Sequence, residues 1–265
     1  MRVRAVVAYD GTDYQGFQRQ ANGPTVQEVL EAALEQVSGE RRTVLAAGRT
    51  DAGVHAQGQV IAFDTTWRHT LAELQRALNA VLPADVAVRE LKEARPDFHP
   101  RYDAQSRWYR YTIYNHIVRS PLERRTSLHV PQQLDVEAMQ AAAQCLLGVH
   151  DLATFGTPPQ GENSVRRVLR AQWQSLSPWL FFDIEADAFL YRMVRSLVGT
   201  MLRVGTGQMT VEAFEAALAA RERSLAGPTA AAHGLCLMAV YYREDDLVDP
   251  LSRSEEGENV RDESE

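Results

Sequence analysis

The chain has 265 residues, of which 45% are hydrophobic and 24% charged, a balance typical of a packed globular protein. The formal net charge is −7, but ten acidic and two basic residues lie in 244–265, which leaves 25 acidic and 26 basic residues in the rest. No run of about 18 apolar residues occurs, and the first ten residues do not resemble a signal peptide, so we expect a cytoplasmic protein without a membrane span. The two cysteines, Cys145 and Cys236, are too few for a disulfide scaffold or a four-cysteine zinc site.

The first hundred residues predict four strands and two helices around a polar loop. Alternating residues predict a strand over 2–9, and Thr25 with Glu28 forms a capping box that begins a helix ending at Gly39. The same box recurs at Thr70 and Glu73. Further strands are predicted at 43–47, 57–64 and 86–91. The order β-α-β-β-α-β is that of a ferredoxin-like unit.

The second half predicts the same order of elements. A strand is expected at 107–114, followed by a helix capped by Asp135. A hairpin of two strands at 166–176 and 180–186 comes next, then a long apolar helix at 189–204. A shorter helix at 211–221 precedes the last strand at 235–242. We therefore expect an α+β fold of two ferredoxin-like halves, 1–103 and 104–243, followed by an acidic flexible tail, 244–265. Joined edge to edge, the halves would form one mixed sheet with helices on one face and a central groove across the other.

The segment 46–59 contains more glycines and reactive polar side chains than a simple turn between two strands requires. It contains three glycines together with Arg49, Asp51 and His55. In a plain hairpin loop Asp51 would cap backbone N–H groups and Arg49 would be solvated. In a functional loop the carboxylate could be a nucleophile, a general base or a metal ligand.

The sequence lacks the motifs of several common classes of metal-binding, nucleotide-binding and hydrolytic proteins. The other histidines are scattered and no HxH or HExxH spacing occurs, so no metal site is expected. No Gly-x-Ser-x-Gly elbow is present, and the glycine-rich segments match neither the P-loop nor GxGxxG. We therefore expect neither a nucleotide cofactor nor a serine hydrolase.

The stretch Gly48-Arg49-Thr50-Asp51-Ala52-Gly53-Val54-His55-Ala56 resembles the signature of the TruA family of tRNA pseudouridine synthases. Further segments agree with this family in the same order along the chain, namely 9–12, 14–20, 25–27, 97–101, 107–115 and 189–195. The resemblance covers about residues 1–243.

The resemblance implies the pseudouridine synthase fold and the isomerisation of uridine to pseudouridine in the anticodon stem-loop of tRNA, at positions 38, 39 and 40. It implies no cofactor, since the exchanged bonds have equal oxidation level, and it implies a homodimer. Asp51 would be the catalytic nucleophile, kept ionised by Arg195. Tyr109 would stack on the target uracil, and Arg49 would fill the space that the flipped nucleotide leaves or grip its phosphate.

Alternative interpretations of these residues remain open. Along 107–111 alternate residues point to opposite sides, so Tyr109 could simply fill the core. Arg195 could be a residue on the surface of its helix, at the edge of the apolar stripe. Phosphate contacts are expected from a set of arginines along the groove: Arg19, Arg101, Arg107, Arg110, Arg166 and Arg167. The rival functions are a non-catalytic RNA-binding protein and an N-glycoside hydrolase that releases uracil, in which Asp10 or Asp13 would be the second carboxylate.

Overall fold

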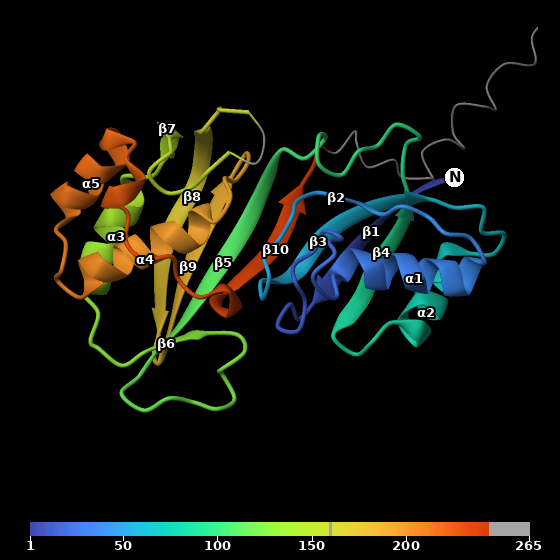
Figure 1. Ribbon diagram of the computed structural model, residues 1–265, viewed down its shortest axis with the longest axis horizontal. Helices are drawn as coiled ribbons and strands as arrows, with labels where there is room; N and C mark the ends of the chain where they lie inside the picture. The colour runs from blue at the N-terminus through green and yellow to red at the C-terminus, as the bar shows by residue number, and fades with distance from the viewer. Residues whose placement is uncertain (159–160, 244–265) are drawn as a thin grey trace, which may run out of the picture.

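The computed structural model describes residues 1–158 and 161–243. Within them one ten-stranded mixed sheet crosses the molecule, with α1 and α2 over one half and α3, α4 and α5 over the other, on the same side (Figure 1). The strands are β1 (Arg2–Tyr9), β2 (Leu45–Ala46), β3 (His55–Asp64), β4 (Val86–Glu93), β5 (Ser106–Asn115), β6 (Leu128–Val130), β7 (Gly148–Asp151), β8 (Val165–Leu176), β9 (Trp179–Ala186) and β10 (Leu235–Tyr241). The helices are α1 (Val26–Ser38), α2 (Leu71–Val81), α3 (Val136–Gln144), α4 (Met193–Gly205) and α5 (Val211–Ala220), with short 3-10 turns η1 (Arg223–Leu225) and η2 (Ala232–Gly234).

The N-terminal half has the predicted ferredoxin-like arrangement. Its strands run in the order β4-β1-β3, and the short β2 pairs with β3. Alternate residues of β1 are buried, which places one face of the strand under the helices. Both predicted capping boxes are present: Thr25 with Glu28 begins α1, and Thr70 with Glu73 begins α2. The predicted helix starts are therefore confirmed.

The C-terminal half repeats this order as β10-β5-β9-β8, with β7 added at the edge. The last strand, β10, lies between the halves, parallel to β3 and antiparallel to β5. At the junction a Cβ on Gly58 would lie 2.3 Å from the Met238 carbonyl oxygen, so only glycine allows the two backbones to approach this closely. The expected continuous mixed sheet is confirmed.

The predicted elements differ from the structure chiefly at the start of α4 and in two short strands. The helix predicted to begin at residue 189 begins at Met193, because Tyr191 exchanges backbone hydrogen bonds with Thr157 and Arg192 adopts a left-handed conformation with φ of 61°. The strands β6 and β7 were not predicted, since each is short and gains its hydrogen bonds from a neighbouring strand.

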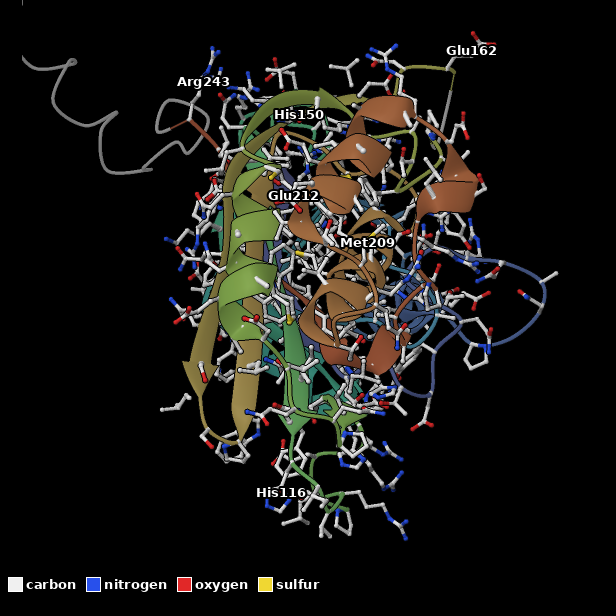
Figure 2. The ribbon with its side chains drawn as sticks, turned by 90° about the vertical axis from the view of Figure 1, so that its left-hand side faces the viewer. His116, His150, Glu162, Met209, Glu212 and Arg243 are labelled. Carbon is white, nitrogen blue, oxygen red and sulfur yellow. The ribbon has the colours of Figure 1, made fainter. Side chains whose placement is uncertain are left out.

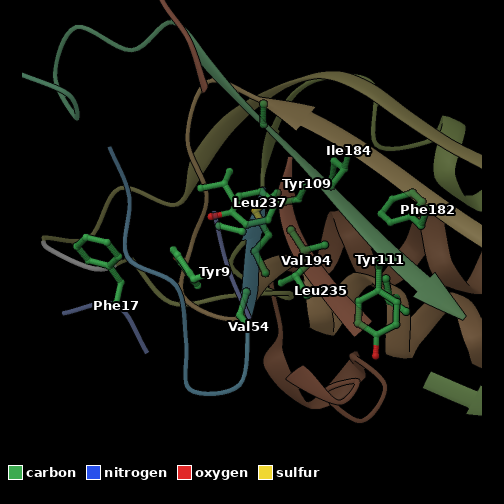
Figure 3. Close-up of a cluster of buried hydrophobic side chains, with 14 of the residues drawn as sticks. Tyr9, Phe17, Val54, Tyr109, Tyr111, Phe182, Ile184, Val194, Leu235 and Leu237 are labelled. Carbon is green, nitrogen blue, oxygen red and sulfur yellow. The ribbon is translucent and has the colours of Figure 1, made fainter. Parts of the chain in front are cut away.

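One apolar core runs through both halves (Figure 3). Buried Tyr9 and Val54 of the first half belong to the same cluster as Tyr109, Val194 and Leu237 of the second. A smaller cluster on the other side of the first half contains Ala47, Val60, Ala62, Ala94 and Phe98. Since the main core is shared, the division at residue 103 stays a prediction. The expected tail, 244–265, lies outside the described residues.

Candidate active site

A cavity of about 1130 Å³ opens between the two halves. Its lining includes Phe17, which precedes α1, and Met193, Val194 and Arg195 of α4. These residues lie on the side of the sheet that carries the helices. The expectation of a groove on the opposite face is therefore wrong, because the helical layers of the two halves leave space between them at the β3–β10 junction.

The loop before β3 is held against the segment that follows β1. The Phe17 N–H donates to the Thr50 carbonyl over 3.1 Å, and the Tyr9 hydroxyl lies 2.7 Å from Thr50 Oγ1. Gly16 has φ of 92°, and a Cβ on it would lie 2.6 Å from the Thr50 carbonyl oxygen. Glycine at this position thus allows the close approach that fixes the residue next to Asp51.

Asp51 forms an ion pair with Arg195, which comes from the other half of the chain. Nη1 of Arg195 lies 2.9 Å from Oδ2 of Asp51, and their side chains are 14% and 20% exposed, respectively. Nε of Arg195 donates to the Ala230 carbonyl over 2.8 Å. The guanidinium is thus tethered on one side and presents the other to the carboxylate, which is partly shielded from water but accessible from the cavity.

Tyr109 lies on β5 at the floor of the cavity and is 8% exposed. Its ring meets Phe189 edge-on, with the centroids 4.9 Å apart. Burial raises the pKa of the Tyr109 hydroxyl; the charge of Arg107 lowers it and that of Asp51 raises it further. The hydroxyl therefore stays protonated near neutral pH and is able to donate a hydrogen bond.

Five of the predicted RNA-contact arginines line the cavity, namely Arg19, Arg49, Arg101, Arg107 and Arg166. Arg49 is exposed, and within the described residues its side chain has no ion pair or hydrogen bond, so it does not pair with Asp51. Arg19 pairs with Glu31 at 2.9 Å. The guanidinium of Arg107 is largely committed within the protein, since it donates to four backbone carbonyls.

Arg110 and Arg167 do not line the cavity. Arg110 lies on the opposite face of β5 from Tyr109, where Nε and Nη2 each contact buried Asp183 over 2.8 Å. Arg170 and the Trp108 indole N–H also donate to this carboxylate. Arg167 is exposed on β8, next to the edge strand β7. Neither guanidinium is near the Asp51–Arg195 pair.

Among the cavity-lining residues outside the expected site are Phe189, Tyr191 and Arg192. The Arg192 guanidinium lies 4.8 Å from the centre of the half-exposed Tyr191 ring. All three belong to the segment 189–195, which was already singled out for its resemblance. A continuous helix was expected over this segment, but the helix begins only at Met193, and the preceding turn places the three residues at the cavity.

The described part of the chain contains neither a cluster of metal ligands nor a helix that could span a membrane. No cluster of three or more histidine, cysteine, aspartate or glutamate side chains is arranged to hold a metal ion there. No helix within residues 1–158 and 161–243 is long and apolar enough to cross a bilayer.

Comparison with known proteins identifies the family. The family described as tRNA pseudouridine synthase matches residues 5–103 and 142–243. A tRNA pseudouridine synthase A of Moorella thermoacetica is 50% identical over 245 residues, which cover 91% of this chain and 99% of that protein. Another from Roseiflexus castenholzii is 47% identical over 90% of both chains. The loop before β3, the cavity and the ion pair are present, and the match extends over most of the chain. The chain therefore belongs to the tRNA pseudouridine synthase family.

Proposed function

We propose that this tRNA pseudouridine synthase acts on the anticodon stem-loop of tRNA, at positions 38, 39 and 40, and that Asp51 is its nucleophile. The observation that carries the proposal is the ion pair of Asp51 with Arg195 in the cavity between the halves. In the reaction the N1–C1′ bond of uridine breaks, a C5–C1′ bond forms, and the proton on C5 is lost while N1 gains one. Redox state does not change, so no redox cofactor is needed.

Asp51 acts as an ionised carboxylate, either by attack on C1′ or by removal of a proton from the ribose to give a glycal. Both routes need the negative charge, and the Arg195 guanidinium lies 2.9 Å away, where it attracts that charge. Because Ala230 holds the same guanidinium, Arg195 also fixes the direction in which the carboxylate points. A charge placed and oriented in advance does not have to reorganise during the reaction.

Tyr109 supports the uracil while it turns. Its ring lies in the cavity and is kept in place by the edge-on contact with Phe189. Stacking of a base on an aromatic ring contributes about 1–3 kcal/mol. The protonated hydroxyl is available to act in proton transfer at C5.

Arg49 takes part in extruding the target nucleotide. Flipping a base out of a stem costs a few kcal/mol, and least near a loop. An exposed guanidinium two residues before the nucleophile, with no partner within the described protein, is free to occupy the vacated stack or to bind the flipped phosphate. Arg19, Arg101 and Arg166 supply further phosphate contacts along the cavity, whereas Arg107 mainly shapes its wall.

We also propose that the protein is a cytoplasmic homodimer, since one subunit offers a small surface for a tRNA. The loop after β5 projects beyond the end of the sheet, where Figure 2 labels His116. It exposes Ile117, Val118 and Leu122, which are 79%, 63% and 90% exposed. Sedimentation of the protein with and without Leu122→Asp tests this: a dimer at micromolar concentration is expected, and a monomer for both proteins contradicts it.

The isomerisation is tested with tRNA that carries tritium at C5 of uracil. Release of tritium to water, without chain cleavage or free uracil, is the expected result for the wild type. Asp51→Asn keeps the shape and removes the charge, so it should bind tRNA and release no tritium. Free uracil would indicate a hydrolase, and unchanged release by Asp51→Asn would indicate another nucleophile.

The position of the target is tested with anticodon stem-loops in which single uridines are replaced. Substrates that keep uridine only at 38, 39 or 40 should each react, and a substrate with uridine only elsewhere should not. Binding should weaken steeply with salt if the arginines contact phosphates, by a logarithmic slope of about 0.7–0.9 for each contact.

A further inference from the structure

His55 is a buried polar residue that the proposed chemistry does not use. It is the first residue of β3, four positions after Asp51, and is 7% exposed. It does not line the cavity, so it does not touch the substrate. Yet both of its ring nitrogens lie within hydrogen-bond distance of other segments, which a plain core position would not require.

The two ring nitrogens contact different segments of the chain. Nε2 lies 2.8 Å from the Arg125 carbonyl oxygen and 3.1 Å from that of His233, so it carries the proton. Nδ1 accepts from the Gly11 N–H over 3.0 Å. The Asp10 carboxylate lies beside it, with Oδ1 3.1 Å from Nδ1, and that oxygen is itself held by the Thr12 N–H and hydroxyl. The imidazole thus uses both of its nitrogens.

On its Nδ1 side the ring holds the segment that supports Asp51. Gly11 begins the stretch whose later residues contact the catalytic loop: the Tyr14 carbonyl accepts from the Gly53 N–H over 3.2 Å, and the Phe17 N–H donates to Thr50. A shift of Gly11 would therefore be passed to both sides of Asp51.

On its Nε2 side the ring holds the segment that orients Arg195. His233 belongs to η2, which follows directly on Ala230 and Ala231. The Ala230 carbonyl accepts from Nε of Arg195, and its N–H donates to the Arg195 carbonyl over 3.0 Å. One rigid ring thus fixes the spacing between the two supports of the ion pair.

We propose that His55 is a positioning residue for the Asp51–Arg195 pair, which it keeps in register by bonding Gly11 through Nδ1 and the carbonyls of Arg125 and His233 through Nε2. The proposal rests on the proposed function, because it assumes that Asp51 reacts. It predicts that loss of the ring affects the chemical step more than the binding of tRNA. A misplacement of about 1 Å can reduce a reaction rate by about a hundredfold.

Three substitutions separate the two sides of the ring. His55→Ala removes both contacts, His55→Asn keeps an acceptor near Gly11, and His55→Gln carries an amide N–H toward the two carbonyls. The matched control is Asn79→Ala, because Asn79 also joins two segments by two hydrogen bonds, to the Val88 N–H and carbonyl, at the outer edge of the first half. It should lower stability without reaching the site.

The readouts are kcat and KM by tritium release, the Kd for tRNA and the urea midpoint. We expect kcat to fall about a hundredfold in His55→Ala with KM and Kd within about twofold, and to recover about tenfold in Asn or Gln. Asn79→Ala should keep kcat at any loss of stability. If His55→Ala does not fold, the Asn and Gln variants decide, since their kcat should fall while their KM does not.

Three results would overturn the proposal: a kcat for His55→Ala within about threefold of wild type, a change in KM rather than kcat, or an equal loss of kcat in Asn79→Ala at equal stability. Asp51→Asn is measured in parallel. If that variant still forms product, the proposed function fails; if it is inactive while His55→Ala is fully active, only the role of His55 fails.

Discussion

Replacement of Arg195 by methionine removes the charge opposite Asp51 and keeps most of the side-chain volume. At 2.9 Å two unit charges attract each other by about 6 kcal/mol at an effective dielectric constant of about 20. Both side chains are partly exposed, and the cost of desolvating them opposes the attraction. We therefore expect a net loss of about 2–3 kcal/mol in the activated complex, which is a fall of about 30- to 150-fold in kcat.

Arg195→Lys separates charge from geometry. A lysine keeps the positive charge, but its single ammonium does not reproduce the planar fork that contacts Ala230 and Asp51 with separate nitrogens. Its rate should lie between those of wild type and Arg195→Met. Single-turnover tritium release at saturating enzyme gives the rate of the chemical step, and a binding titration gives the Kd for tRNA.

The result that would refute this reasoning is a rate for Arg195→Met within about threefold of wild type, with tRNA binding intact. The ion pair would then be structural, and Asp51 would be oriented by its own loop alone. A rate for Arg195→Lys equal to that of wild type would show that charge is sufficient and that the Ala230 tether is dispensable.

Three further predictions concern the Tyr109 hydroxyl, the close contact of Gly16 with Thr50 and the Cys236 thiol. Tyr109→Phe keeps the stacking ring and removes the hydroxyl, so single-turnover assays should show a rate about a hundredfold lower with Kd unchanged; equal losses in both would contradict this. Gly16→Ala places a Cβ against the Thr50 carbonyl at a φ of 92°, so urea unfolding should show a loss of about 1–3 kcal/mol, and an unchanged midpoint would contradict it. Burial raises the pKa of the Cys236 thiol from 9.0 to about 12, so the unfolded chain loses this proton first as pH rises. Unfolding free energy should decline above about pH 9, less so in Cys236→Ala, and iodoacetamide at pH 9 should modify Cys236 more slowly in the folded protein than in the unfolded chain.

Elements that depend on neighbouring residues were predictable from the sequence. Thr25 and Thr70 begin helices because each accepts from a backbone N–H three residues later, a contact that needs no distant partner. The alternation along β5 correctly placed Arg107 and Tyr109 on one face and Arg110 on the other. It did not show which face carries the cavity, and therefore Arg110 was grouped with the RNA contacts.

The resemblance of Gly48–Ala56 selected Asp51 as the residue to consider, and family membership follows from the match over most of the chain. The sequence by itself thus determined the helix starts, the repeated order of elements and the motif around the carboxylate, since each is a property of adjacent residues. Only the tertiary structure decided that β10 lies between β3 and β5, that the helix layers leave the cavity between them, and that Arg195 meets Asp51 across 144 positions of sequence. Contacts at that separation depend on how whole elements pack, because the cost of closing a long loop says nothing about which side chains meet at its ends.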